Sequence, residues 1–346
     1  MNKLCVIGNF GSDKGSYDGQ TVKTHNTYLA LCNILGKPNV AFINTNGGLK
    51  KIPMLIFKTI LAAYQNHNII MLPAQNGLKL FAPLLSLLSR ISDCKMHYVV
   101  IGGWLPNLLS CNAILKKSLM NFCGIYVETN TMKTGLEKEG VKSIYILPNF
   151  KHIKVLNEKE LVIIKKEPFK LCTFSRVMKE KGIEDAVNAV KAVNDVIGRT
   201  VYTLDIYGQI DKEQTGWFAK LQTKFPGYVK YKGLVPFDKT TEVLKDYFLL
   251  LFPTKFYTEG IPGTIIDAYA AGVPVVCSKW QSFADLVDDT VGYGYEFSSG
   301  VALENLLKKI YIEDIDKILA MKKVCILKSK QYMPEKVVEI LINKLQ

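Results

Sequence analysis

The sequence of 346 residues lacks any apolar run of the roughly 18–20 residues that a membrane-spanning helix needs. Its start, NKLCVIGNF, has the pattern of a strand rather than of a signal peptide, so we expect a cytoplasmic protein. The eight cysteines form no C-x-x-C pair and most lie in apolar segments, which favours reduced thiols over disulfides or a zinc site. Neither a low-complexity tract nor a solenoid repeat is present, so the length predicts two packed domains.

Acidic residues are scarce in the first half of the chain. Residues 1–150 hold 15 Lys and Arg against 6 Asp and Glu, which is most of the net charge of +13. Such an excess suits nucleic acid, an anionic membrane or a phosphorylated substrate, and a solvated lysine-rich surface is the ordinary alternative. The chain has no recognisable nucleic-acid-binding module, so we expect no nucleic-acid partner and keep a basic nucleic-acid-binding protein as the least favoured alternative.

Short, continuously apolar runs alternate with amphipathic segments, as expected for parallel sheets covered by helices on both faces. This predicts an α/β protein with Rossmann-like domains at 1–160 and 169–328, and a last segment, 329–346, whose helix could pack back on the first domain. The expected strands are 4–8, 40–44, 68–73, 97–103, 124–129 and 143–149, then 169–175, 202–208, 229–233, 248–253 and 273–278. Ligands of open α/β sheets bind beyond the carboxyl ends of the strands, so functional residues are sought there.

The first candidate is a glycine-rich loop between the first expected strand and a helix. Glycines let the backbone approach a ligand, and a helix N-terminus favours a phosphate. The spacing is not G-x-G-x-x-G, which argues against a dinucleotide site. Gly15 and Gly19 are our candidate donor contacts in this loop, with a long loop of no binding role as the alternative.

Two cations follow the strand at 169–175. Arg176 and Lys181 stand five residues apart, and Gly182 introduces the next helix. A guanidinium fork and an ammonium at a strand end suit a diphosphate. Ordinary surface charges are the alternative.

The segment EGIPGTIID, Glu259 to Asp267, follows the strand at 248–253. Pro262 and Gly263 open a helix there, and the free N–H groups of Gly263 and Thr264 would seat a phosphate. Asp267 lies one turn inside that helix, where its carboxylate can accept hydrogen bonds from ribose. An acid before a helix can also be simple dipole compensation.

Taken in order, these elements resemble the retaining glycosyltransferases of the GT-B architecture, family 4 type (glycosyl transferases group 1), found in synthesis of capsule, O-antigen and other bacterial surface polysaccharides. The matching stretches are Arg176 to Gly182, DIYGQ (205–209), YKGLV (231–235), and Glu259 to Asp267 followed by AAGVPVV. ILPNF (146–150) is similar to the end of that family's first domain. Asp267 departs from the pattern, which has Glu there.

The resemblance implies two facing Rossmann-like domains with a deep cleft, and a hexosyltransferase (EC 2.4) that needs no metal. It implies a nucleotide-sugar donor, UDP-sugar favoured, and a glycan or polyprenyl-diphosphate-linked acceptor. It assigns catalysis to Arg176, Lys181 and Glu259, and ribose binding to Asp267. The other implied donor contacts are Ser175, Gly208, Gly260, Ile261, Pro262, Gly263 and Thr264.

Acceptor contacts are expected from His97, Gly103 and Trp104, because Trp104 follows a strand and an aromatic ring can stack on a sugar. For His97 a structural role is the alternative. Segments 78–91 and 112–122 mix apolar and basic residues at helical spacing, which suits either core helices or a peripheral position on the anionic inner face of the plasma membrane. A sugar-nucleotide epimerase of the same architecture is the second function considered, and the four histidines count against it.

Overall fold

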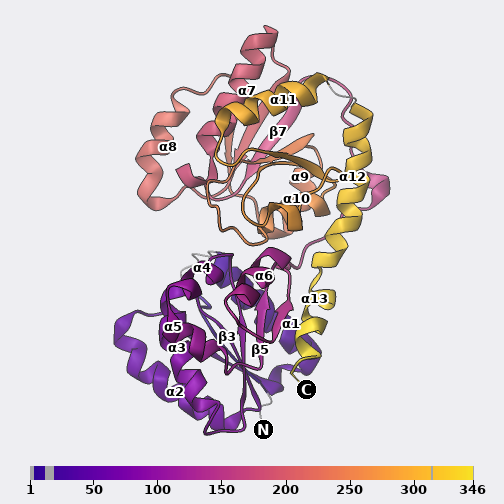
Figure 1. Cartoon of the computed structure of the whole chain (residues 1–346). Coiled ribbons are helices and arrows are strands. Elements are labelled where there is room, and N and C mark those ends of the chain that lie inside the picture. The colour runs from indigo at the N-terminus through magenta and orange to yellow at the C-terminus, as the bar shows by residue number, and fades with distance from the viewer. Residues whose placement is uncertain (1–3, 12–18, 313–314, 346) are drawn as a thin grey trace. The chain divides into compact units, whose positions relative to one another are not determined.

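The computed structural model describes residues 4–11, 19–312 and 315–345. The chain divides into two compact units (Figure 1). Unit 1 comprises the residues up to His152 together with those from Tyr332 onward, and unit 2 runs from Ile153 to Gln331.

Unit 1 is built on a parallel sheet of six strands in the order β2-β1-β3-β4-β5-β6. Its strands are β1 (Leu4–Gly8), β2 (Val40–Asn44), β3 (Asn68–Leu72), β4 (Lys95–Val99), β5 (Gly124–Val127) and β6 (Ile144–Ile146). Its helices are α1 (Gly19–Leu35), α2 (Ile52–Gln65), α3 (Gln75–Leu88), α4 (Leu105–Ser110), α5 (Ala113–Leu119), α6 (Asn130–Lys138) and α13 (Pro334–Ile342).

Successive side chains of the central strands in unit 1 enter two different cores. In β1, Cys5 and Ile7 pack with α2 and α3, whereas Leu4 and Val6 pack with α1 and α13. Both sets are almost fully buried, which is why these strands are continuously apolar in the sequence.

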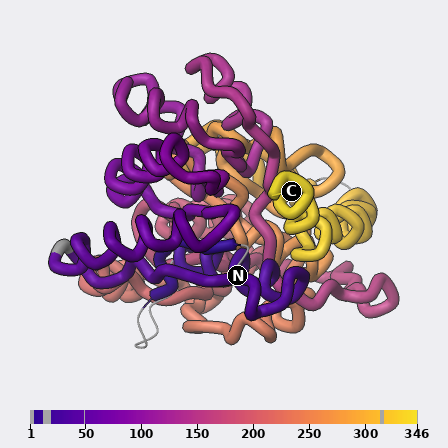
Figure 2. Tube along the Cα trace, turned by 90° about the horizontal axis from the view of Figure 1, so that it is seen from below, coloured from indigo at the N-terminus to yellow at the C-terminus, as the bar shows by residue number. Residues whose placement is uncertain are grey.

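Helix α13 belongs to unit 1 although it follows the whole of unit 2 in the sequence. Its Val337, Val338 and Leu341 are buried in the core that contains β1. The helix lies beside α1, and the Asn68 amide donates to the Leu345 carbonyl at 3.0 Å (Figure 1, Figure 2). The last segment therefore covers one face of the first sheet.

Unit 2 has a second parallel six-stranded sheet, ordered β12-β11-β10-β7-β8-β9. Its strands are β7 (Phe169–Phe174), β8 (Tyr202–Tyr207), β9 (Val229–Gly233), β10 (Leu249–Phe252), β11 (Val275–Ser278) and β12 (Gly292–Tyr295). Its helices are α7 (Ile183–Ile197), α8 (Thr215–Gln222), α9 (Thr240–Leu244), α10 (Gly263–Ala270), α11 (Gly300–Ile312) and α12 (Ile315–Ser329).

The sequence analysis did not predict the last strand of unit 2, β12, or its helices α11 and α12. Strand β12 reads GYGY, with two glycines and no apolar run, so nothing in its pattern indicated a strand. Gly292 is there because a Cβ would lie 2.3 Å from the Val275 carbonyl oxygen of the neighbouring strand. Within the described residues, none of the helices has the length and apolarity to cross a bilayer.

Candidate functional site

The centre of the second sheet is a topological switch point. The chain leaves β7 toward β8 on one side and later returns to β10 on the other. In open α/β sheets this arrangement opens a crevice beyond the carboxyl ends of the strands, where ligands bind. The loops that follow β7 and β10 carry Arg176, Lys181 and Glu259, so the sequence-predicted cations and acid come from adjacent strand ends.

Two glycines let the loops of unit 2 approach one another. Gly182 has φ +67°, and a Cβ there would lie 1.9 Å from the Pro253 carbonyl oxygen at the end of β10. Gly208 has φ +133°, and a Cβ would lie 1.8 Å from the Ser175 carbonyl oxygen. A side chain at either position would push the strand-end loops apart, so both glycines shape the site through the backbone.

Lys181 and Glu259 form an ion pair across the switch point. Their side chains are 17% and 18% exposed, so the pair is partly shielded and still reachable from solvent. Glu259 also accepts from the Thr254 hydroxyl at 3.2 Å, and the Lys181 ammonium lies 4.9 Å from the centre of the Phe256 ring. An ammonium held this way has further donors to offer an incoming anion.

Arg176 is held more loosely than Lys181. Its guanidinium lies 3.7 Å from the Asp211 carboxylate and its side chain is 44% exposed. Such an exposed contact contributes little to stability, so Arg176 can turn toward a ligand at small cost. Its neighbour Ser175 is half-buried.

Helix α10 begins in the same region. Pro262 is the residue before its first turn and caps it with no side-chain hydrogen bond. The first N–H groups of a helix have no intrahelical partners and attract negative charge. The Thr264 hydroxyl donates to the Phe174 carbonyl at the end of β7, which fixes the start of α10 against the first loop. Gly263 and Thr264 are half-buried, whereas Gly260, Ile261 and Pro262 are buried behind them.

Asp267 is far less accessible than Glu259. It lies one turn inside α10 and is only 3% exposed. A ligand oxygen would find little carboxylate surface there. The geometry of unit 2 therefore supports Glu259 and the start of α10 as ligand contacts more strongly than Asp267.

Unit 1 has its own cavity at its own switch point, where β1 lies between β2 and β3. The cavity measures about 730 Å³ and lies beyond the carboxyl ends of these strands. Residues of α2 and α3 form part of its wall, and its polar and aromatic lining includes Asn9, Gln20, Thr45, Asn46 and Trp104. Asparagine, glutamine and threonine side chains around an aromatic ring are groups that can bind a polyol.

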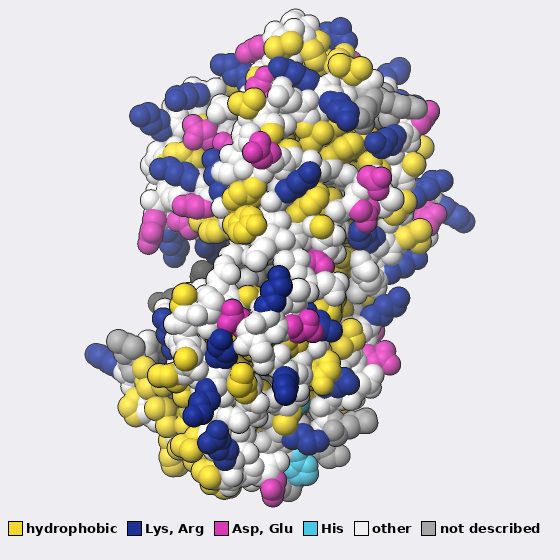
Figure 3. Space-filling view, in the orientation of Figure 1, with side chains coloured by type: hydrophobic (Ala, Val, Ile, Leu, Met, Phe, Trp, Pro, Cys, Tyr) yellow, Lys and Arg dark blue, Asp and Glu magenta, His cyan; other side chains and the backbone are white. Residues whose placement is uncertain are grey.

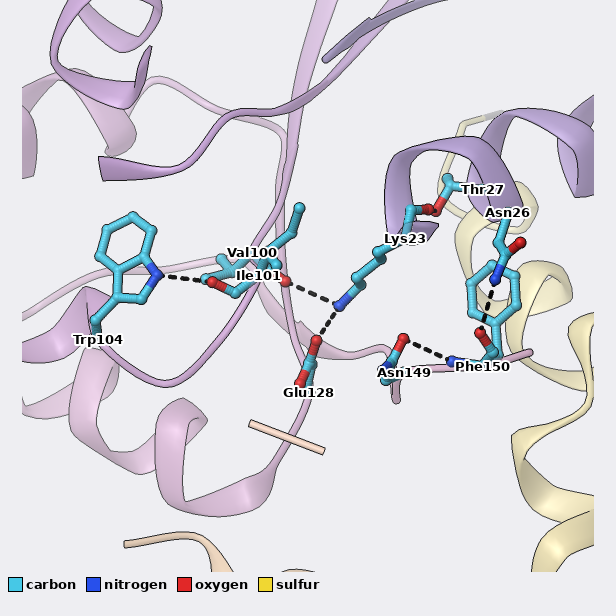
Figure 4. Close-up of polar contacts among 9 residues, drawn as sticks. All are labelled: Lys23, Asn26, Thr27, Val100, Ile101, Trp104, Glu128, Asn149 and Phe150. Carbon is cyan, nitrogen blue, oxygen red and sulfur yellow. Dashed lines mark hydrogen bonds and ion pairs between the residues drawn. The ribbon is translucent and has the colours of Figure 1, made fainter. Parts of the chain in front are cut away.

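Trp104 is fixed by a network at the ends of β4 and β5 (Figure 4). Its indole N–H donates to the Ile101 carbonyl at 2.7 Å, and the Lys23 ammonium donates to the preceding carbonyl, that of Val100, at 3.0 Å. Lys23 also forms an ion pair with Glu128, and the two side chains are 3% and 4% exposed. The turn with Gly102 (φ +77°) and the buried Gly103 lies between these anchors.

His97 lies inside β4 and not at a strand end, which corrects its prediction as an acceptor contact. It is 1% exposed, and its ring nitrogens contact the Asn68 amide oxygen at 3.1 Å and the Tyr126 hydroxyl at 3.2 Å. Burial, with a smaller effect of Lys95, lowers the pKa of His97 to about 4. The side chain is a neutral structural histidine. Of the predicted loop glycines, Gly19 begins α1 and Gly15 falls outside the described residues.

Residues 168–311 match the family model described as Glycosyl transferases group 1. This segment, less than half of the chain, resembles the group 1 glycosyl transferases. The match covers the loops with Arg176, Lys181 and Glu259 and the start of α10. The two parallel six-stranded Rossmann-like sheets are those of the GT-B fold, as in HepE of Anabaena.

The known proteins that are similar to this chain are distant from it in sequence. The amylovoran biosynthesis glycosyltransferase AmsK of Erwinia amylovora is 25% identical over 36% of this chain. The GtfA subunit of a UDP-N-acetylglucosamine–peptide N-acetylglucosaminyltransferase of Streptococcus agalactiae is 31% identical over 32%. The matches span only 31% and 21% of those proteins. HepE, solved with UDP and glucose, has a TM-score of 0.74, covers 100% of this chain and 99% of its own, and is 14% identical.

Sequence reasoning missed the cavity of unit 1 and the ion pair beneath Trp104. A usable signal existed for the cavity, because Asn9 and Thr45 each stand just after an expected strand and Pro73 is the last residue of another. The Lys23–Glu128 pair left no such signal. Its partners are 105 positions apart, and only the packing of α1 against the ends of β4 and β5 brings them together.

Proposed function

We propose that the protein is a retaining glycosyltransferase that moves a hexose from a nucleoside-diphosphate sugar to a glycan or polyprenyl-diphosphate-linked acceptor. The observation that carries the proposal is the accessible Lys181–Glu259 pair beside the uncapped start of α10, inside the group 1 segment. A cation and free helix N–H groups at one switch point suit a diphosphate.

The reaction requires stabilisation of the leaving group, the nucleoside diphosphate. The bond between the anomeric carbon and the diphosphate oxygen breaks, its electron pair stays on the diphosphate, and the acceptor oxygen bonds to the same carbon and loses its proton. Lys181 and Arg176 neutralise the charge that develops on the diphosphate, and the start of α10 (Gly263, Thr264) adds its dipole. These groups supply the electrostatic stabilisation without a metal ion in our proposal.

The roles of the other residues are proposed from where they lie around the Lys181–Glu259 pair. Glu259 accepts hydrogen bonds from sugar hydroxyls once Lys181 turns to the phosphates. Ser175 and Gly208 line the approach to Lys181 and Glu259. Residues 260–262 and Asp267 are buried behind the start of α10 and support it. Trp104 and Gly103 serve the acceptor in unit 1.

UDP is the favoured nucleotide and surface polysaccharide the favoured pathway. HepE was solved with UDP, and AmsK acts in amylovoran biosynthesis. Both support the proposal as distant relatives only. We place the reaction on the cytoplasmic side of the plasma membrane, where lipid-linked acceptors are exposed to nucleotide sugars.

The test is calorimetric titration of the full chain with UDP, GDP and ADP, followed by incubation with the matching nucleotide sugars in EDTA. We expect one diphosphate to bind and its sugar to be transferred or slowly hydrolysed. At about 100 times its dissociation constant this ligand should add roughly 2.7 kcal/mol to the free energy of unfolding. The variant Lys181→Ala should lose the binding. Lys255→Ala, which removes an ion pair between the loop after β10 and Asp185 of α7, should keep it.

Two results would overturn the proposal. One is the absence of binding to all three diphosphates and their sugars. The other is formation of an epimerised nucleotide sugar without any acceptor, which would assign the site to an epimerase.

A further inference from the structure

Two strands of the sheet in unit 2 have one face that is open. Side chains of β8 and β9 alternate between buried and accessible, whereas those of β1 and β3 are buried at every position. In β8, Leu204 and Ile206 enter the core with α7, and Asp205 between them lies on the opposite face. Parallel sheets are usually covered on both faces, so the open face of β8 and β9 is a candidate binding surface.

A cavity of about 610 Å³ lies on this open face. Three adjacent strands contribute side chains at alternate positions to its lining: Lys170 of β7, Thr203 and Asp205 of β8, and Lys230 and Lys232 of β9. The rest of its lining precedes β8 and β9 in the sequence: Thr200, Gly227 and Tyr228. The cavity therefore lies toward the amino ends of these strands, away from the crevice at their carboxyl ends.

The cavity concentrates positive charge. Figure 3 shows basic side chains spread over one face of the molecule with acidic ones between them. In this cavity, by contrast, three exposed lysines surround a single acid, Asp205. Among the residues that the structure describes, none of these three lysines forms an ion pair. Three ammonium groups around one cavity attract an anionic ligand.

Asp205 gives the cavity a fixed hydrogen-bond acceptor among these cations. The Tyr247 hydroxyl donates to its Oδ2 at 2.7 Å, and the Tyr207 hydroxyl lies 2.9 Å from that of Tyr247. The other carboxylate oxygen, Oδ1, has no partner in the described part of the chain. This carboxylate repels a ligand that has only negative charge, whereas a sugar hydroxyl can donate to it. The Tyr228 ring adds an aromatic surface to the lining, which suits the apolar face of a sugar.

We propose that the open face of β8 and β9 is a second binding site, which holds an acidic glycan. The lysines bind the carboxylates of its sugar acids, Asp205 and Thr203 bind hydroxyls, and Tyr228 packs on a sugar ring. The lining spans three strands, roughly 10 Å across, which leaves room for consecutive sugars of a chain. The inference rests on the proposed function, because an enzyme that extends an acidic glycan would keep the growing chain attached here between transfers.

The test is equilibrium binding of the full chain to labelled oligogalacturonate, with a neutral dextran oligosaccharide of the same length for comparison. We expect the acidic oligosaccharide to bind about tenfold more tightly than the neutral one, and salt to weaken its binding. The double variant Lys230→Gln, Lys232→Gln should lower this affinity by about tenfold. The matched control Lys220→Gln, Lys224→Gln removes the same charge at α8, which packs on the other face of the sheet, and should bind like wild type.

The sign of the effect at Asp205 separates a glycan from other polyanions. Asp205→Asn removes a negative charge, so it should strengthen the binding of any ligand that is recognised by charge alone. It should instead weaken the binding of oligogalacturonate by about threefold to tenfold, because a sugar hydroxyl loses its charged acceptor. Stronger binding by Asp205→Asn, or equal affinity for oligogalacturonate and polyglutamate, would overturn the inference in favour of an acidic protein partner.

The two proposals can fail separately. All four variant proteins and wild type should bind UDP equally, because the donor groups lie at the carboxyl ends of the strands. Binding of UDP without binding of oligogalacturonate would overturn this inference and leave the transferase proposal standing. Displacement of the oligosaccharide by UDP, or equal oligogalacturonate binding by wild type and the Lys230→Gln, Lys232→Gln variant, would also overturn it.

Discussion

In the part of the chain that the structure describes, each unit has a Lys–Glu pair near the carboxyl ends of its strands, and the two pairs differ in burial. Lys23 and Glu128 in unit 1 are 3% and 4% exposed, and Lys23 also donates to a backbone carbonyl. Lys181 and Glu259 in unit 2 are 17% and 18% exposed and stand beside the start of a helix. The same two residue types thus form a buried structural ion pair in unit 1 and an accessible candidate site in unit 2.

The degree of burial distinguishes a structural ion pair from a functional one better than the residue types do. A buried pair whose partners are satisfied by each other and by the backbone has nothing left to give a ligand. A partly exposed pair gains little stability from its contact, so its charges are available for chemistry. The contrast leads to opposite expectations for substitutions that look alike in the sequence.

The largest effect on stability is expected from Lys23→Met. It leaves the Glu128 carboxylate buried without its partner, which should lower the free energy of unfolding by about 3–5 kcal/mol. Urea unfolding followed by circular dichroism measures this loss. The double variant Lys23→Met, Glu128→Leu removes both charges and should recover most of it. If the single variant is as stable as wild type, the comparison between the two pairs fails.

The largest effect on turnover is expected from Lys181→Ala. It removes a cation from the developing diphosphate and should lower kcat by about 10²–10³-fold. The free energy of unfolding should change by no more than about 1 kcal/mol, because the pair is partly exposed. Steady-state kinetics and urea unfolding of the same preparation test both parts, and Lys255→Ala serves as the control. If Lys181→Ala lost activity and stability together, the Lys181–Glu259 pair would be structural, like the Lys23–Glu128 pair.

The buried His97 of unit 1 makes the free energy of unfolding depend on pH. Its pKa is lowered to about 4 from an ordinary value of 6.5, so the unfolded chain binds its proton more readily than the folded one. The His97 contribution to the free energy of unfolding is therefore fully present above pH 6.5. About 3 kcal/mol of it is lost as the pH falls to about 4.

Urea unfolding between pH 7 and pH 4 measures this slope. The variant His97→Asn should flatten the wild-type slope, and His152→Asn, at an exposed position, should not. A wild-type slope retained by His97→Asn would assign the pH dependence to other groups.

Most strands and the group 1 motifs were predictable because both depend on local sequence. Continuous apolar runs gave the strands around Arg176 and Glu259, and the order of motifs indicated the family. Burial was not predictable, because it depends on what packs over a residue. His97 looked like a strand-end residue and is inside β4, and Asp267 looked like Glu259 and is sealed within α10.

The smallest effect is expected at Trp104, which the Lys23 network holds beside the cavity of unit 1. Loss of one stacking surface in Trp104→Ala should raise the KM for the acceptor by about threefold to tenfold. The affinity for the nucleotide should not change, since the donor groups are in unit 2. Acceptor titration at saturating donor measures the effect, and Trp104→Phe should restore most of it. If Trp104→Ala instead weakens nucleotide binding and leaves the acceptor KM unchanged, the cavity of unit 1 is not the acceptor site. The Lys23–Glu128 pair next to Trp104 would then have only a structural role.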